Sequence, residues 1–295
     1  MKRRTLLVAA VAAALGGAAA RASGAGRYEA GLLWRVDGLG DAPSHVYGTL
    51  HAEDPRLARL PSPVLAAFES SRALMVEHAP DRYTRERFLE AALYLDGRTL
   101  VDDLGEADFE RAVRAMRPIG LSREFILKLK PWGVLLNLRL SGQPGGGETP
   151  EAQLARLARA RRMGISQIEN VEEQIFTFDE MSSAAQVALL RHSLAHPEEL
   201  DALAEHSLQA YLRGDLKALW DAQEAFSNRH PELRAHRAEL MKRVVLDRSV
   251  VMAYRMQREL RRGRAFVAVG ALHLYGPKGV LALLEDDGLR AERVV

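Results

Sequence analysis

The chain of 295 residues contains no cysteine. This absence excludes a disulfide scaffold, thiolate chemistry and lipid attachment at a cysteine of a signal sequence. Aromatic residues are also sparse, at 6% of the chain. Stability must therefore come from an ordinary aliphatic core, and a chain of this length can supply one or two such cores.

A surplus of basic charge is also lacking once the N-terminus is set aside. The whole chain has 41 Lys and Arg against 39 Asp and Glu. The first 22 residues hold four of the basic residues and no acidic one, which leaves 37 against 39, a formal charge of −2. A nucleic-acid-binding protein is expected to show a basic surplus or stripe, so the sequence predicts no nucleic-acid partner.

Only one long hydrophobic run is present, and it lies at the N-terminus. Lys2, Arg3 and Arg4 precede an apolar stretch over residues 5–20, and small residues flank Arg21. This is the pattern of a cleavable signal peptide, residues 1–22, with cleavage near Ala22. An uncleaved anchor is the alternative, but 16 residues rich in Ala and Gly are short for a span of roughly 20. We expect a periplasmic or secreted protein without a stable membrane span after cleavage, exported by the Sec or the twin-Arg route.

The rest of the chain, residues 23–295, is expected to form a single domain of the α/β (α+β) class. Short apolar runs near both ends predict strands, and the middle, about 84–262, predicts helices interrupted by a strand near 165–169. The expected architecture is a mixed central sheet built from both chain ends, with the middle as a large helical insertion or cap. The strands are expected within 32–51 and at 73–77, 165–169, 265–273 and 290–295, and the main helices at 62–71, 84–94, 106–117, 122–139, 151–162, 178–262 and 278–285.

The two ends of the chain resemble each other. Gly48-Thr49-Leu50-His51 and Gly270-Ala271-Leu272-His273 each follow an apolar run and precede a loop, a helix and a further strand. A Gly-x-x-His tetrapeptide is weak evidence alone, but a strand-loop-helix-strand unit places side chains at the mouth of a sheet where ligands bind. Gly48 and Gly270 would allow close backbone approach as supporting residues, and each imidazole could bind a metal or carry a proton. Two capping or core histidines remain the alternative.

Two glutamates end predicted strands in the same way. Glu77 closes the run Ala-Leu-Met-Val-Glu, and Glu169 closes Ile-Ser-Gln-Ile-Glu. His51, Glu77 and His273 form a donor set that suits zinc, manganese or cobalt. Glu169 could then act as general base or orient a histidine. Solvent-exposed strand-end glutamates are the plainer alternative.

Arg248 lies on the helix before the last strand unit, where it could clamp a substrate carboxylate or stabilise an oxyanion. An ordinary surface arginine is the alternative. Asp102-Asp103 is predicted to be a loop feature. His192 and His196 are spaced four residues apart and could bind a metal together, but no Glu follows His192 as in the HExxH pattern. The remaining histidines of the helical middle are therefore predicted to be surface residues: His192, His196, His206, His230 and His236. Motifs of serine hydrolases, P-loop NTPases and dinucleotide-binding dehydrogenases are absent from the sequence. No organic cofactor is therefore predicted.

Taken together, these segments resemble the TraB/GumN (Tiki/TraB/PrgY) family. The resemblance rests on His45–His51, Val76-Glu77, Lys130-Pro131-Trp132, Ile168-Glu169 with Glu173-Gln174, and the closing stretch Phe266–Gly279 followed by Gly288. It covers nearly the whole chain after the signal, in the same order. Two positions depart from the family pattern: Ser249 follows Arg248 where the family has Asn, and Glu151 is the nearest acidic residue where the family has Asp before the "LE" element.

The resemblance implies a metal-dependent hydrolase, peptidase-like, that acts on a peptide or protein. It implies metal-binding or catalytic roles for His51, Glu77 and His273, with Glu169 and Arg248 as supporting catalytic residues and a divalent ion (Mn, Co or Zn) as the cofactor. Two rivals stay open at this stage. One is a non-catalytic periplasmic protein that binds a peptide or oligosaccharide, and the other is a metal-free hydrolase. The oligomeric state is left open.

Overall fold

The computed structural model describes residues 26–295 except 39, 41, 80 and 142–147. The predicted signal peptide lies outside the described residues. Within them, no helix combines the length and the apolar character that a membrane crossing requires.

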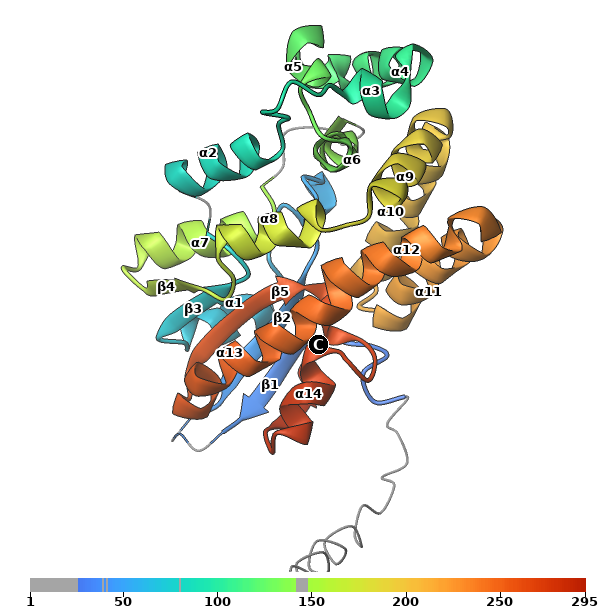
Figure 1. Ribbon diagram of the computed structural model, residues 1–295. Helices are drawn as coiled ribbons and strands as arrows, with labels where there is room; N and C mark the ends of the chain where they lie inside the picture. Colours follow the sequence, from blue (N-terminus) through green and yellow to red (C-terminus); the bar gives the residue numbers. More distant parts are fainter. Residues whose placement is uncertain (1–25, 39, 41, 80, 142–147) are drawn as a thin grey trace, which may run out of the picture.

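A mixed six-stranded sheet lies at the centre, as the sequence predicts (Figure 1). Its order is β4-β3-β5-β2-β1-β6, and β1 runs antiparallel to both of its neighbours while the other strand pairings are parallel. Both chain ends contribute, since β1 and β2 pair with β6 and β5 respectively. The strands are β1 (Leu33–Asp37), β2 (Ser44–Thr49), β3 (Ala73–Val76), β4 (Gly164–Gln167), β5 (Ala265–Gly270) and β6 (Arg290–Arg293).

The two predicted strand-helix-strand units are both present. β2 leads through α1 (Ser62–Glu69) to β3, and β5 leads through α14 (Val280–Asp286) to β6. β5 is inserted between β2 and β3, so the C-terminal unit completes the sheet begun by the N-terminal one. All six residues of β5 are buried, which accounts for its unbroken apolar sequence, because a central parallel strand has both faces covered.

Alternate side chains of the strands build two cores. On β5, Phe266 and Ala268 pack with residues of α1 and α7 (Pro150–Ala160) on one face. Val267 and Val269 pack with residues of α13 (Arg248–Arg262) and α14 on the other. The molecule is therefore a helix-sheet-helix sandwich. The predicted helical insertion does more than cap the sheet, because α7 and α13 themselves form parts of the two covering layers.

The remaining helices form the cap. They are α2 (Arg82–Ala91), α3 (Leu100–Leu104), α4 (Glu106–Met116), α5 (Arg123–Leu127), α6 (Pro131–Ser141), α8 (Val171–Asp179), α9 (Ser183–Ala195), α10 (Pro197–Leu212), α11 (Leu216–Arg229) and α12 (Arg234–Met241) (Figure 1). Part of the cap has its own core around Phe109, Met116 and Trp132, whereas α10 and α11 also bury residues in the core of the sheet. Short 3₁₀ turns lie at Pro55–Leu57 (η1), Arg117–Ile119 (η2) and Pro231–Leu233 (η3).

Three predicted boundaries differ from the structure. The helix expected over 122–139 is two helices, because Pro131 cannot continue α5 and instead begins α6. Asp102 and Asp103, expected in a loop, belong to α3. This helix begins with a capping box formed by Thr99 and Asp102. The strand expected over 265–273 ends at Gly270, and His273 lies on the 3₁₀ turn Ala271–Leu274 (η5).

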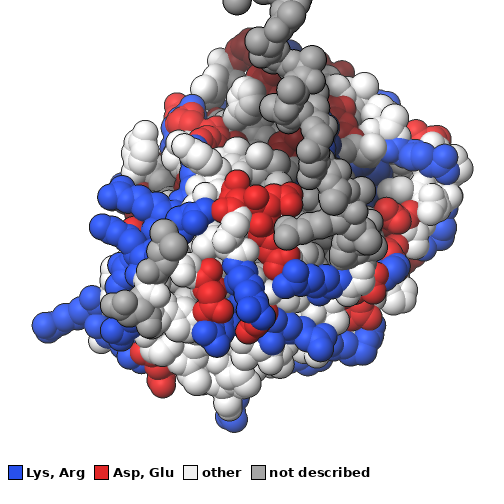
Figure 2. Space-filling view, turned by 90° about the horizontal axis from the view of Figure 1, so that it is seen from below, with Lys and Arg blue, Asp and Glu red and all other residues white. Residues whose placement is uncertain are grey.

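Acidic and basic side chains lie beside one another on the face seen from below (Figure 2). This surface shows red patches of Asp and Glu between blue groups of Lys and Arg.

Candidate functional site

Four predicted site residues follow four neighbouring parallel strands. His51 comes two residues after β2, Glu77 directly after β3, Glu169 two residues after β4, and His273 on the turn after β5. The order β4-β3-β5-β2 therefore brings them to one edge of the sheet. The carboxyl ends of parallel strands are the usual place for a ligand site in α/β folds.

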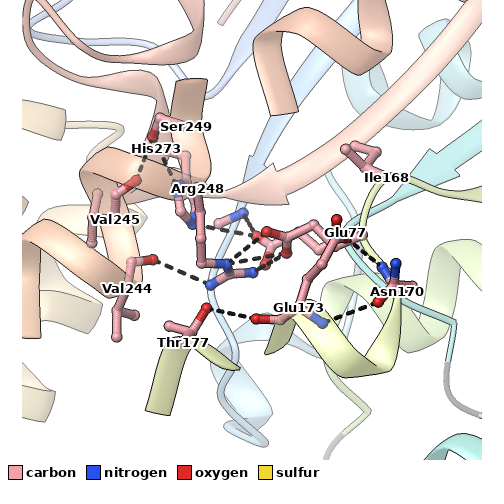
Figure 3. Close-up of polar contacts among 12 residues, drawn as sticks. Glu77, Ile168, Asn170, Glu173, Thr177, Val244, Val245, Arg248, Ser249 and His273 are labelled. Atoms are coloured by element: carbon pink, nitrogen blue, oxygen red, sulfur yellow. Dashed lines mark hydrogen bonds and ion pairs between the residues drawn. The ribbon is translucent and has the colours of Figure 1, made fainter. Parts of the chain in front are cut away.

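Glu77 is the centre of the cluster. Its Oε1 lies 3.7 Å from Nε2 of His51 and 3.8 Å from Nε2 of His273, and it accepts the backbone N–H of Gly270 at 2.5 Å. Its Oε2 accepts a hydrogen bond from Arg248 at 2.6 Å (Figure 3). Burial raises the pKa of Glu77, but His51, His273 and Arg248 outweigh it and hold the pKa well below the ordinary value. The carboxylate is thus ionised and lies between the two imidazoles.

The two glycines of the tetrapeptides make room for this arrangement. A Cβ on Gly270 would lie 3.2 Å from Oε1 of Glu77, 3.4 Å from Cδ2 of His273 and 3.5 Å from Nε2 of His51. The three predicted ligands therefore surround the open side of Gly270. A Cβ on Gly48 would lie 2.7 Å from Leu274, which packs the turn carrying His273 against β2. At both positions a side chain would crowd the site or the turn that carries it.

Arg248 is partly buried and joins two carboxylates. Its Nη2 lies 2.6 Å from Oε2 of Glu77 and 2.6 Å from Oε2 of Glu169, and its Nε donates to Glu169 at 3.0 Å. Its Nη1 donates to the carbonyl of Val244. The chain from Lys242 to Asp247 (η4) is a π-helical turn that runs directly into α13. Such turns are rare and frequently occur at functional sites, and this one places Arg248 at the start of α13.

Burial raises the pKa of Glu169 above its ordinary value, although Arg248 opposes the shift. The Glu169 side chain is almost completely buried. The backbone N–H of Glu169 donates to the backbone carbonyl of Glu77 at 3.0 Å. Glu169 is therefore held next to Glu77 by the sheet as well as by the guanidinium. The predicted surface alternatives for Arg248 and for the two strand-end glutamates are wrong.

Ser249 sets the tautomer of His273. Its hydroxyl donates to the carbonyl of Val245 at 2.8 Å and lies 2.9 Å from Nδ1 of His273 (Figure 3). A hydroxyl has one hydrogen, so Ser249 must accept the Nδ1–H of His273. Nε2, which lies 3.8 Å from Oε1 of Glu77, then carries the lone pair. Burial lowers the pKa of His273 to about 4, against the opposing effect of Glu77, so the imidazole is neutral.

Glu151 is the site residue that the sequence identified only as a substitute for a family aspartate. It lies in the first turn of α7, and its Oε1 is 2.8 Å from Nδ1 of His51. Burial lowers the pKa of His51, but Glu151 and Glu77 outweigh it and raise the pKa well above the ordinary value. The His51 side chain is 54% exposed, whereas His273 is buried. His51 therefore forms the solvent side of the cluster.

This arrangement can hold a divalent cation. Oε1 of Glu77 and Nε2 of His51 face the cradle left by the missing side chain of Gly270, and Nε2 of His273 lies 3.8 Å from the same Oε1. Each imidazole has its Nδ1 engaged by another side chain, which is the arrangement that fixes the orientation of metal-ligating histidines. Two imidazoles and a carboxylate are donor types that zinc, manganese and cobalt bind. Their donor atoms are not all within 4.8 Å of one another, since among the described residues only His192, His230 and Glu232 form such a set, so the strand-end side chains would have to move closer to share an ion.

Two histidines predicted to be simple surface residues are engaged instead. His192 and His230 are partly buried, and both imidazoles contact the carboxylate of Glu199. The prediction was wrong because the two histidines are 38 residues apart in sequence, and only the packing of α9 against the end of α11 brings their side chains together.

The fold and the site define an α/β protein with two histidines and three glutamates gathered at the carboxyl ends of parallel strands. The model of the TraB/PrgY/gumN family matches residues 32–293, and the chain belongs to this family. No curated protein and no solved structure gives a significant match to the chain.

Proposed function

We propose that the protein is a metal-dependent hydrolase of the cell envelope that cleaves an amide bond in a peptide or protein. The observation that carries the proposal is the convergence of His51, Glu77 and His273 on the open side of Gly270. Export to the periplasm or the exterior follows in this proposal from the signal-like N-terminus.

His51, Glu77 and His273 would hold the ion. A divalent ion bound there supplies Lewis acidity, which polarises a carbonyl and makes a water easier to deprotonate. Ser249 keeps Nε2 of His273 unprotonated, and Glu151 orients His51 through Nδ1. The ligand atoms are thus oriented before any ligand arrives, which lowers the cost of binding.

Glu169 is the proposed proton acceptor. Its raised pKa suits a general base better than that of Glu77, which is held strongly ionised. Arg248 keeps the two carboxylates in place and supplies a positive charge beside them that stabilises an oxyanion. His51, being exposed, lies where a substrate can reach the cluster.

The first test is metal content. The mature chain, residues 23–295, is purified without chelator beside the His51→Ala/His273→Ala double variant and a His206→Ala control, whose imidazole is exposed on α10. We expect the double variant to contain about one equivalent of Mn, Co or Zn less than the wild type and the control. Equal metal content in all three would remove the metal from the proposal.

The second test is turnover on a peptide library. Hydrolysis that a chelator stops, that Mn²⁺ restores and that each single histidine variant loses would establish the activity. Turnover that survives chelation would favour a metal-free hydrolase. Peptide binding without cleavage would favour the non-catalytic binding protein.

A further inference from the structure

A second cluster of imidazoles and carboxylates lies in the helical cap. His192 belongs to α9, Glu199 to α10, His230 directly follows α11, and Glu232 lies on η3. Three helices and a 3₁₀ turn therefore meet at these four side chains. None of them takes part in the site at the strand ends.

The imidazole of His230 lies between two carboxylates. Its Nε2 is 2.6 Å from Oε2 of Glu199, and its Nδ1 is 3.4 Å from Oε1 of Glu232. Glu199 also contacts Nε2 of His192 at 3.4 Å, and the two imidazole rings are 4.2 Å apart between centroids. When Nε2–H of His230 donates to Glu199, the lone pair of Nδ1 faces a second carboxylate. A cation between Nδ1 of His230 and the carboxylate of Glu232 would remove the repulsion between this lone pair and the carboxylate.

The spacing of the donors suits a transition metal. His192, His230 and Glu232 each offer one ligand atom, and these atoms all lie within 4.8 Å of one another. Ligand atoms at about 2.0–2.1 Å from a tetrahedral zinc stand roughly 3.4 Å apart, so small side-chain rotations close the set. Glu199 then has the role of the carboxylate that orients a metal-bound histidine through its other nitrogen.

An aromatic ring covers one side of the cluster. The ring of Phe226 packs against His192 and His230, with ring centroids at 5.5 and 5.1 Å. Binding of a metal here would release protons from the imidazoles, because the ligand nitrogens must be unprotonated.

We propose that His192, His230 and Glu232 bind a divalent transition metal, zinc in the first place, and that this ion fastens α9 to the end of α11 and to η3. The role is structural, since it joins elements of the cap that are distant in sequence. It stands independently of the proposed hydrolase, because no residue is shared between the two sites.

The test uses the His51→Ala/His273→Ala variant of the mature chain as its background, so that the strand-end site is already disabled. Zinc binding is measured by competition with a chromophoric chelator. We expect one equivalent to bind the background variant and to raise its Tm. Adding His230→Gln should abolish this binding, and adding Glu232→Gln should weaken it at least tenfold.

Two features keep the result interpretable. Glu232 has a 65% exposed side chain, so its replacement leaves the fold intact even where His230→Gln does not. The exposed His206 serves as the matched control, and His206→Gln should leave the affinity unchanged. The proposal is overturned by a background variant that binds no zinc, or by an affinity that neither His230→Gln nor Glu232→Gln reduces.

Discussion

Nη2 of Arg248 lies 2.6 Å from a carboxylate oxygen of Glu77 and 2.6 Å from one of Glu169, so a single nitrogen joins the ends of β3 and β4. All three side chains are nearly inaccessible to water, with Arg248 only 14% exposed. Removing one partner from such a buried arrangement leaves uncompensated charge, which costs far more than losing a surface pair.

The first prediction concerns the stability contributed by this arrangement. Arg248→Met should lower the free energy of unfolding by about 3–5 kcal/mol, because Glu77 and Glu169 are left side by side without their shared cation. Urea unfolding followed by circular dichroism measures the loss. Arg255→Met, two turns further along α13, removes a partly exposed pair with Glu173 and should cost less than ~1 kcal/mol. Equal losses in the two variants would show that burial does not set the cost.

The second prediction concerns the hydroxyl that orients His273. Ser249→Ala removes the acceptor of the Nδ1–H, so the ring is free to change tautomer and rotate. We expect affinity for Mn²⁺ or Zn²⁺ at this site to fall by about 10–100-fold. Calorimetric titration in the His230→Gln background, in which the cap cluster should no longer bind zinc, isolates the strand-end site. The control is Ser227→Ala, since Ser227 makes the same bond to a carbonyl four residues earlier but contacts no imidazole. An unchanged affinity in Ser249→Ala would assign the serine to helix packing alone.

Much of the strand-end site could be predicted because each residue is adjacent to a local pattern. His51, Glu77, Glu169 and His273 all follow short apolar runs, and parallel strands present such positions at one edge. The family resemblance, confirmed by the match over residues 32–293, supported the same residues. The sheet order was beyond reach, because nothing in the local sequence says that β5 lies between β2 and β3.

The contacts made by the cap were harder to predict. Glu151 is 100 residues from His51, and only the folding of α7 against the sheet brings the two to 2.8 Å. The pairing of His192 with His230 depends likewise on how α9 and α11 pack. By contrast, α3 begins at a local signal, the capping box of Thr99 and Asp102, which favours a helix rather than a loop at Asp102 and Asp103.

The third prediction concerns the cradle at Gly270. Its backbone angles, φ −55° and ψ 136°, are open to any residue, so alanine introduces no backbone strain. The added Cβ would crowd Oε1 of Glu77 at 3.2 Å. Gly270→Ala should therefore weaken metal binding at least tenfold and cost about 1–3 kcal/mol of stability through overpacking.

Calorimetric titration and urea unfolding measure these two effects. Gly164→Ala is the control, because a Cβ there meets no atom within 4 Å. If Gly270→Ala binds metal as the wild type does, then the ligands do not converge at this point.

The fourth prediction concerns the pH dependence of stability through His45. This half-buried residue of β2 lies opposite Arg35, and its Nδ1 has no hydrogen-bond partner among the described residues. Burial lowers the pKa of His45, the charge of Arg35 lowers it further, and Asp37 opposes them. The pKa is therefore lower in the folded than in the unfolded chain, where it is near 6.5. As the pH falls through that value, the unfolded state takes up more protons than the folded state, and stability is lost.

Urea unfolding at pH 7.5 and pH 5.5, with chelator present, measures this loss. His45→Gln cannot take up the proton, so its free energy of unfolding should fall less between the two pH values than that of the wild type. His206→Gln removes an exposed imidazole and should behave as the wild type does. A His45→Gln variant that loses as much stability as the wild type would mean that other groups cause the acid sensitivity. The expected difference would instead show that β2 loses stability when the imidazole opposite Arg35 gains a proton.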